Sequence, residues 1–504
     1  NDGADSLIGG AGIDTITGGA GADTLNGGAD TDIMDGGTDN DTYLIAAGDH
    51  GAAEIADAGG TADEVRFTST TAQTLTIFAG DTGLEIVKIS DAAGVLTGTT
   101  AENINASAAA NGLSIIGNNG ANTLTGTGFA DTITGNDGAD SLIGGAGIDT
   151  ITGGAGADSI TGGLGDDNLS GGADADTFNV DSGTDTITDL SGTTTADILK
   201  VSNGAIVIAT VTAAFTATID TTNTNAAIGA ATLSSAGFDV DMSLAGVGNG
   251  YTINNTAAPA LTILIGSGFN DIINGGTGVD TIKGMAGDDA LFGGAGADNI
   301  EGGSGVDSIT GGAGADVINL LEGAASIDHV IYTSTTDGNT LGAITVAGAD
   351  SVINFVIANN DTIDIGGALR SGLANGGTEL ASDLLGNVLD AGTDARVNLG
   401  ANDIFTVQVT NLTVVADFAN AALLLGAGNA LDLDDTAGGS DTFKTTTVVA
   451  GDQAIFLVAD NGGLSGLYLF TASNTNNSIE TNELTLLSII AANAQLTHAN
   501  IVVI

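Results

Sequence analysis

The chain has 504 residues and a formal net charge of −55, since 62 acidic residues face only seven basic ones. This charge excludes nucleic acid and anionic membrane surfaces as partners, because both are themselves negative, and it implies a cationic partner. With 42% apolar residues and a mean hydropathy of +0.29, the chain is too apolar to be a solvating segment that is disordered throughout, although folding that waits for a cation fits both numbers.

The absence of cysteine excludes disulfides and thiolate metal sites. No stretch reaches the roughly 18 consecutive apolar residues of a membrane-spanning helix. The first residues contain no basic segment followed by an apolar run, so we expect any export signal to lie elsewhere.

The opening string NDGADSLIGGAGIDTITGGAGAD, residues 1–23, returns unchanged at residues 136–158. It is part of a nine-residue period with the pattern G-G-x-G-x-D-x-apolar-x, which keeps glycine, aspartate and an apolar residue in phase over three segments. A flexible glycine linker has no reason to keep three residue types in register. The in-phase aspartates are Asp5, Asp14, Asp23, Asp32, Asp41, Asp131, Asp140, Asp149, Asp158, Asp167, Asp176, Asp271, Asp280, Asp289, Asp298, Asp307 and Asp316.

This period predicts a coiled β structure that needs a counter-ion. Glycine turns followed by one inward apolar residue indicate very short strands, and two nine-residue halves would close one coil. Stacked coils place equivalent aspartates about 4.8 Å apart, where two carboxylates repel by roughly 3 to 4 kcal/mol at an effective dielectric constant near 20. A hard divalent ion bound by oxygen atoms removes this repulsion, and flexible all-oxygen sites favour Ca²⁺ over Mg²⁺. Zinc is disfavoured because the chain has no cysteine and only three histidines.

These segments resemble the nonapeptide repeats of the RTX family, a calcium-binding parallel β-helix pattern. The resemblance covers residues 1–45, 117–179 and 266–319. It implies a β-roll in which the in-phase aspartates are calcium ligands, with roughly twelve ions if each ion lies between one loop and the loop two units on. Asn122, one step before the second block, offers a neutral ligand and should bind more weakly.

Some units depart from the pattern at their fourth position, where glycine is usual. Asp30, Asp39 and Asp174 stand there, and we expect the fold to survive because aspartate tolerates the left-handed region better than most residues. Phe129 and Phe269 replace the same glycine at the openings of the second and third blocks. We expect edge coils with an incomplete ion site at both places.

The sequence predicts an all-β chain of parallel β-roll or β-solenoid blocks, linked by β-rich spacers and closed by a β-rich cap. The expected regions are a first block at 1–45, a spacer at 46–116, a second block at 117–199, a spacer at 200–265, a third block at 266–324, and a capping region at 325–504. The spacers are rich in β-branched runs and would form either calcium-free coils or small β-sandwiches. Coils are favoured, because residues 114–126 lead into the second block without a break.

The last third contains further strand-like runs, at 350–355, 360–367, 441–445, 454–460 and 466–470. The family resemblance implies that this region caps the solenoid and carries an uncleaved type I secretion signal. Residues 472–494 resemble the second half of an EF-hand loop, with Asn474, Asn476 and Glu483 as candidate ligands but Ala472 in place of the first aspartate. A capped helix with Glu483 in its first turn is the favoured alternative.

Groups suited to catalysis are few. His50, His329 and His498 stand alone, and none of the common hydrolase, metalloprotease or phosphate-loop motifs occurs. Asp328 precedes His329 directly, and we expect a solvent-exposed loop pair, since adjacent strand residues point to opposite faces. The seven basic residues are too scattered along the chain to indicate an anion cleft. We therefore expect no enzyme activity in this chain.

Two functions from different classes follow. The first is a secreted, calcium-stabilised structural protein, outside the cell or on a bacterial surface, that builds a surface layer, filament or adhesive matrix as a homo-oligomer or lattice, with a cell-surface polysaccharide as candidate partner. The second is the carboxy-terminal RTX portion of a secreted enzyme or toxin whose catalytic domain precedes Asn1, because the chain opens inside a repeat. An ice-binding solenoid is a weaker third choice, since the threonines of residues 68–77 form no regular file.

Overall fold

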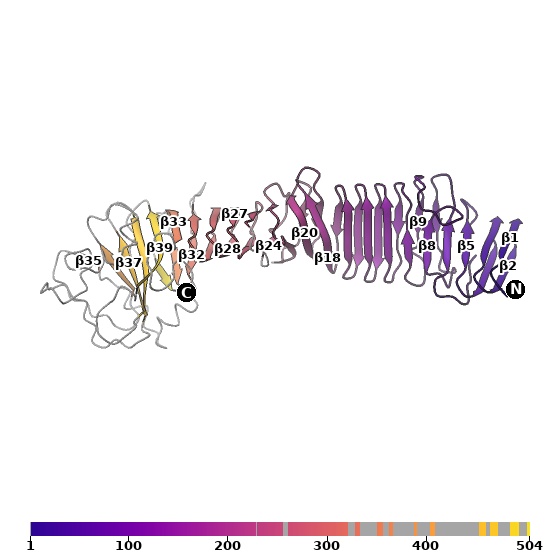
Figure 1. The fold of residues 1–504 in the computed structure, drawn as a ribbon, viewed down its shortest axis with the longest axis horizontal. Helices are drawn as coiled ribbons and strands as arrows, with labels where there is room; N and C mark the ends of the chain where they lie inside the picture. The colour runs from indigo at the N-terminus through magenta and orange to yellow at the C-terminus, as the bar shows by residue number, and fades with distance from the viewer. Residues whose placement is uncertain are drawn as a thin grey trace. The chain divides into compact units, whose positions relative to one another are not determined.

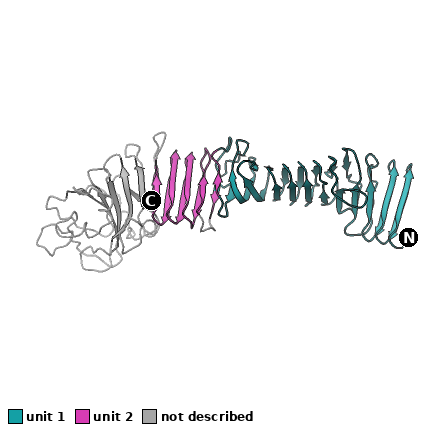
Figure 2. Cartoon of the chain, turned by 45° about the horizontal axis from the view of Figure 1, so that its top comes forward, with its two compact units in different colours: residues 1–238, 244–252 teal, residues 239–243, 253–504 magenta. Residues whose placement is uncertain are grey.

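The computed structural model describes residues 2–227, 229–255, 261–320 and 328–332, together with the backbone of strands at 350–355, 362–365, 388–390, 404–408, 453–459, 464–471, 484–492 and 501–503. Regular structure in these residues is strand throughout, as the sequence predicts. None of them belongs to a helix long and apolar enough to cross a membrane. The chain forms two compact units, residues 1–238 with 244–252 and residues 239–243 with 253–504 (Figure 2).

Short strands follow one another along the chain (Figure 1). Up to residue 201 they are β1 (Ser6–Ala11), β2 (Thr15–Ala20), β3 (Thr24–Ala29), β4 (Ile33–Thr38), β5 (Thr42–Ile45), β6 (Glu64–Phe67), β7 (Thr74–Thr76), β8 (Ile86–Ile89), β9 (Asn103–Asn105), β10 (Ser114–Ile116), β11 (Thr123–Thr125), β12 (Thr132–Asp137), β13 (Ser141–Ala146), β14 (Thr150–Ala155), β15 (Ser159–Leu164), β16 (Asn168–Ala173), β17 (Thr177–Val180), β18 (Thr184–Gly192) and β19 (Ile198–Val201).

The later strands are β20 (Ile206–Thr216), β21 (Thr222–Asn223), β22 (Ala231–Ser234), β23 (Val240–Asp241), β24 (Thr252–Asn254), β25 (Ile263–Ile265), β26 (Ile272–Gly276), β27 (Thr281–Ala286), β28 (Ala290–Ala295), β29 (Asn299–Ser304), β30 (Ser308–Ala313), β31 (Val317–Asn319), β32 (His329–Tyr332), β33 (Asp350–Phe355), β34 (Thr362–Ile365), β35 (Val388–Asp390), β36 (Ile404–Gln408), β37 (Gln453–Ala459), β38 (Leu464–Thr471), β39 (Leu484–Ala492) and β40 (Ile501–Val503).

In the repeat blocks most strands pair with the next strand but one, so that alternate strands build two parallel ladders. In the first unit β12 pairs with β14 in the register Thr132↔Thr150, while β13 pairs with β15 in the register Ser141↔Ser159. Each register step is 18 residues, which is two nine-residue units. In the second unit β27 pairs with β29 and β28 with β30 in the same way. The predicted coil of two nine-residue halves is therefore confirmed.

The core of each coil is the apolar residue two places after the aspartate. In the second block these side chains are fully buried: Leu142, Ile151, Ile160, Leu169 and Phe178. Side chains alternate between the faces of a strand, and the second inward position of a six-residue repeat strand is glycine, as Gly144 follows Leu142, so each of these strands buries one apolar side chain. Burying each contributes about 1.5–3 kcal/mol, so the core is a thin column of single side chains.

Glycine at the turns allows the coils to approach each other. Gly154 has φ +123°, and a Cβ there would lie against the carbonyl oxygen of Asn136 in the neighbouring coil. Asp30, Asp39 and Asp174 adopt φ values of 81°, 78° and 78° at the fourth position of their units. The expectation that aspartate replaces glycine there without breaking the fold is confirmed.

The first spacer continues the solenoid. β5 pairs in parallel with β6, β6 with β8, β8 with β10 and β10 with β12, so residues 46–116 form coils rather than a sandwich. The register step grows to 22 residues between Thr42 and Glu64, because the loops between strands are longer. In the second spacer β18, β20 and β22 pair in parallel within the first unit, as do β23 and β25 within the second.

In the C-terminal region the predicted strands at 350–355, 454–460 and 466–470 are present as β33, β37 and β38. The expected helix after Glu483 is wrong: residues 484–492 form β39, which pairs antiparallel with β38 and parallel with β33. Strand partners on both edges override the helical pattern of this run, since β-branched residues suit a paired strand. The candidate ligands Asn474, Asn476 and Glu483 lie outside the described residues.

The duplicated segment allows a controlled test of the core. Leu142 and Leu7 occupy the same position in identical sequences, but Leu142 is fully buried whereas Leu7 is half-buried. We expect Leu142→Ala to lower the local free energy of unfolding by about 2–5 kcal/mol, and Leu7→Ala to lower it by less. Hydrogen exchange of the two segments in calcium buffer measures both changes. Equal losses at the two positions would contradict the burial argument.

Candidate metal centre

The in-phase aspartates form stacked rows, in which each backbone N–H donates to the Oδ1 atom of the equivalent aspartate in the following coil. Asp131 N donates to Asp149 Oδ1 at 2.8 Å, Asp149 N to Asp167 Oδ1 at 2.8 Å, and Asp167 N to Asp185 Oδ1 at 3.1 Å. We call such a row an aspartate file. The coil period places the carboxylates in the file, and the backbone donors fix one oxygen of each.

Among the described residues the aspartates form six files. In the first unit they are Asp5, Asp23, Asp41 and Asp63; Asp14 and Asp32; Asp131, Asp149, Asp167 and Asp185; and Asn122, Asp140, Asp158, Asp176 and Asp197. In the second unit they are Asp280, Asp298 and Asp316; and Asp271, Asp289, Asp307 and Asp328. Every aspartate that the period singles out therefore lies in a file.

Four file members escape the sequence analysis: Asp63, Asp185, Asp197 and Asp328. Asp185 had a clear signal, because it lies nine residues after Asp176 and two before the buried Ile187. The other three follow their predecessors by 22, 21 and 21 residues, so insertions break the period.

The expected exposed pair of Asp328 and His329 is wrong for the aspartate. Asp328 is fully buried, and its Oδ1 accepts the backbone N–H of Asp307 at 3.0 Å. The reason is the pairing of β32 with β30, which begins at His329 opposite Ser308 and so carries Asp328 to the end of the file.

The second carboxylate oxygen, Oδ2, is buried in most file members and has no hydrogen-bond partner in the protein. This holds for Asp5, Asp14, Asp23, Asp32, Asp41, Asp63, Asp140, Asp149, Asp158, Asp167, Asp176, Asp185, Asp280, Asp289 and Asp298. Buried polar atoms are almost always hydrogen-bonded, and a buried charge without a partner is strongly unfavourable. So many in regular array indicate that a group outside the chain's own atoms satisfies them.

Asp131 and Asp271, which open the second and third blocks, differ. Asp131 Oδ2 accepts the N–H of Thr127 at 2.6 Å, and Asp271 Oδ2 accepts that of Ser267 at 2.5 Å. These oxygens are used within the protein, so the two edge coils offer a cation less than their successors do.

The space beside each free oxygen is kept open by glycine. A Cβ on Gly144 would lie against both Asp149 Oδ2 and the carbonyl oxygen of Gly162 in the adjacent coil, and the same arrangement recurs at Gly153 and Gly284. Carboxylate and carbonyl oxygens therefore meet at a gap that any larger residue would fill. This donor set fits Ca²⁺, which takes oxygen ligands in flexible geometry. When bound, the ion would supply the positive charge that the file lacks.

Without a cation, burial favours the protonated form of several file members. Burial raises the pKa of Asp149 to about 6, that of Asp158 to about 7 and that of Asp289 to about 8, with the charges of neighbouring aspartates adding to the rise and the backbone N–H donors opposing it. The charged state of the file is therefore unfavourable near neutral pH unless a positive ion accompanies it.

Asn122 occupies a file position but uses its amide within the protein. Its Nδ2 donates to the carbonyl of Glu102 at 2.7 Å, and its Oδ1 accepts the N–H of Asn118 at 2.9 Å. The amide thus supplies hydrogen bonds at the position where its successors present an unpartnered oxygen.

Two basic residues that are distant in sequence lie side by side. Arg66 and Lys88 are register partners in β6 and β8, and both contact Glu64, with Lys88 Nζ 2.7 Å from Glu64 Oε2. These two basic residues are scattered in the sequence but adjacent in the fold. Glu64 neutralises part of their positive charge.

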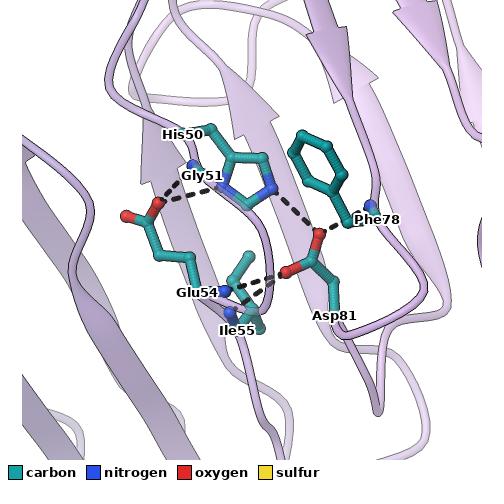
Figure 3. Close-up of polar contacts among 6 residues, drawn as sticks. All are labelled: His50, Gly51, Glu54, Ile55, Phe78 and Asp81. Carbon is teal, nitrogen blue, oxygen red and sulfur yellow. Dashed lines mark hydrogen bonds and ion pairs between the residues drawn. The ribbon is translucent and has the colours of Figure 1, made fainter.

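His50 is not isolated either (Figure 3). Its Nε2 lies 3.0 Å from Asp81 Oδ2 and its Nδ1 lies 3.3 Å from Glu54 Oε2, with the ring of Phe78 at 5.8 Å between centroids. Burial lowers the pKa of His50, but hydrogen bonds to Asp81 and Glu54 and their charges outweigh it and raise the pKa to about 9. The side chain is 5% exposed. The charged imidazole thus links the loop that carries Glu54 to the loop that carries Asp81.

Comparison with known proteins agrees with this geometry. A model of the RTX calcium-binding nonapeptide repeat matches residues 1–34, 8–43, 116–151, 152–187, 265–300 and 292–327. These ranges overlap the three segments in which the nine-residue period was found. A search of curated proteins finds no match to the chain.

The raised pKa values predict how the calcium-free chain responds to pH. Asp149, Asp158 and Asp289 have folded pKa values of about 6, 7 and 8 against an ordinary 3.8, so the metal-free fold is more stable when these three are protonated and loses stability as pH rises from about 4 through 8. We expect circular dichroism in calcium-free buffer to show more β structure at about pH 5 than at about pH 8, and added Ca²⁺ to restore it at the higher pH. A calcium-free chain that is better folded at the higher pH would contradict this assignment.

The raised pKa of His50 predicts the opposite pH window. Its stabilising effect is fully present below pH 6.5 and is lost as pH rises through about 9. We expect His50→Gln to lower hydrogen-exchange protection of residues 46–83 by about 3–5 kcal/mol near neutral pH in calcium buffer, because it leaves two buried carboxylates without their cation. The difference from the native chain should shrink above about pH 9. His329→Gln, in the other unit, is the control and should leave this segment unchanged; a pH-independent difference would be inconsistent with an ion pair.

Proposed function

Because the three blocks are RTX calcium-binding nonapeptide repeats, we propose that this chain is a secreted structural protein that folds on extracellular Ca²⁺ and assembles into a surface layer, filament or adhesive matrix. The observation that carries the proposal is the regular array of buried aspartate oxygens without a partner in the protein. At low calcium the chain avoids this unpaired buried charge only if the carboxylates are protonated or the coils unfold and expose them to water.

Calcium acts as the trigger for folding. A site that exists only in the folded state converts binding free energy into folding free energy. At the low free calcium inside a cell, the charged files keep the chain unfolded and able to be exported. Outside, higher calcium fills the files and the coils close. RTX repeats are typical of secreted proteins, which supports this order of events.

Outward apolar side chains supply the packing surface. An exposed branched apolar residue stands directly before four of the in-phase aspartates: Ile13 and Ile148 in the first unit, 78% and 67% exposed, and Val279 and Val306 in the second. Exposed apolar side chains favour association with another surface. We propose that copies of this chain pack through these positions, with a cell-surface polysaccharide as anchor.

The chain itself is proposed to be non-catalytic. The in-phase carboxylates are engaged in files, and the His50 cluster is charged and enclosed. A role in calcium-dependent folding and assembly explains why these aspartates are buried, and no catalytic role is needed to explain it.

Electron microscopy of a monomeric, chelated sample after addition of Ca²⁺ tests the proposal. We expect ordered sheets or filaments that dissolve again on chelation. A variant with Ile13→Ser and Ile148→Ser should show the native calcium-induced circular-dichroism change but weaker assembly. Folded particles that stay dispersed would overturn the assembly role and favour an RTX region serving another activity.

A further inference from the structure

Three buried carboxylates converge where the first block meets the first spacer. Oxygen atoms of Asp41, Asp57 and Asp63 all lie within 4.8 Å of one another, and the three residues are 1%, 8% and 0% exposed. Only Asp41 belongs to a nonapeptide unit. Asp57 and Asp63 lie in the spacer, beyond the repeat match that ends at residue 43.

Two of these carboxylates are anchored through one oxygen and free at the other. Asp41 Oδ1 accepts the N–H of Asp23 at 2.6 Å, and Asp63 Oδ1 accepts the N–H of Asp41 at 2.7 Å. The Oδ2 atoms of both are buried and have no hydrogen-bond partner. The backbone thus fixes the carboxylates while leaving one oxygen of each without an interaction inside the protein.

The third carboxylate is held by a tyrosine. Tyr43 Oη donates to Asp57 Oδ2 and accepts the N–H of Gly36 at 2.7 Å, while Asp57 Oδ1 accepts the N–H of Gly59 at 2.9 Å. A Cβ on Gly36 would lie against Asp41 Oδ2. The free oxygen of Asp41 and the Tyr43 hydroxyl therefore both lie next to Gly36. The same hydroxyl also contacts Asp57.

The negative charge of this cluster is not balanced by a side chain. In the described part of the chain, no lysine, arginine or histidine forms an ion pair with Asp41, Asp57 or Asp63. Like charges this close repel each other, and burial strengthens the effect. The cluster therefore needs a cation or a proton at the oxygens that the protein leaves free.

We propose that Asp41, Asp57 and Asp63 form a divalent-cation site of the calcium class that belongs to the spacer. It differs from the repeat sites because it has three carboxylates, and because it spans a coil of 22 residues where the repeats have 18. The all-oxygen, strongly negative donor set selects a hard cation. Bound there, the ion fastens the first irregular coil to the last regular coil of the block, so the spacer is not calcium-free.

Tyrosine-sensitised terbium luminescence isolates this site from the many others. The chain has no tryptophan and four tyrosines, and Tyr43 contacts the cluster directly. With Tb³⁺ as the probe in the full-length chain, excitation of tyrosine should give emission that Ca²⁺ displaces. Tyr43→Phe should remove most of this emission while keeping all three carboxylates, and Tyr251→Phe should leave it in place.

The near-isosteric Asp57→Asn variant tests the ligand itself. We expect it to weaken the affinity of the sensitised Tb³⁺ phase on the order of tenfold or more, and calorimetry should count one Ca²⁺ fewer than in the native chain. Asp137→Asn, an exposed carboxylate in the second block, is the matched control and should change neither.

The site is refuted if Asp57→Asn leaves the sensitised emission and the ion count unchanged, since the emission would then come from the regular coil beside it. Emission that survives Tyr43→Phe refutes it as well, because another tyrosine would be the donor. If Asp57→Asn fails to fold in calcium, the sensitised emission and the ion count are measured on Asp57→Ser instead, and an unchanged result there refutes the site.

Discussion

The fold depends on how the stacked carboxylates are neutralised. Each coil buries aspartates whose Oδ1 is fixed by a backbone N–H of the neighbouring coil, as in Asp149 and Asp167, while Oδ2 faces a gap beside glycine. The same hydrogen bonds that hold the coils in register also force the charges together. The contacts that hold the coils together therefore also bring the carboxylates into repulsion. A bound cation removes the repulsion and leaves the hydrogen bonds intact.

The apolar core is too thin to overcome that repulsion alone. Each nine-residue unit buries one column residue such as Ile151 or Leu142, and each coil contacts only its neighbours. Stability in such an array is the sum of units and nearest-neighbour interfaces. A cation bound between two coils therefore stabilises the interface between neighbouring coils, and this interface free energy decides whether the coils stack. The irregular coils also contain ion pairs within the protein, such as those of His50 and of Lys88.

The sequence predicts the coils well because one period sets backbone, core and ligands together. The period does not identify file members that follow an insertion, such as Asp63 and Asp197. Parallel strand pairing places these two aspartates in the files, and that pairing is visible only in the structure. Residues 484–492 show a different limit, because their helical pattern yields to strand partners distant in the sequence. The contacts of His50 with Asp81, 31 residues away, likewise depend on spacer loops that carry no period.

Hydrogen exchange of the full chain at about pH 7.5, in Ca²⁺ and after equilibration with EGTA, tests whether the aspartate files need a cation. We expect strong protection of residues 132–180 in calcium, loss of that protection on chelation, and recovery when calcium returns. Protection that is unchanged in EGTA would mean that the protein tolerates its buried aspartate files without a cation, contrary to this expectation.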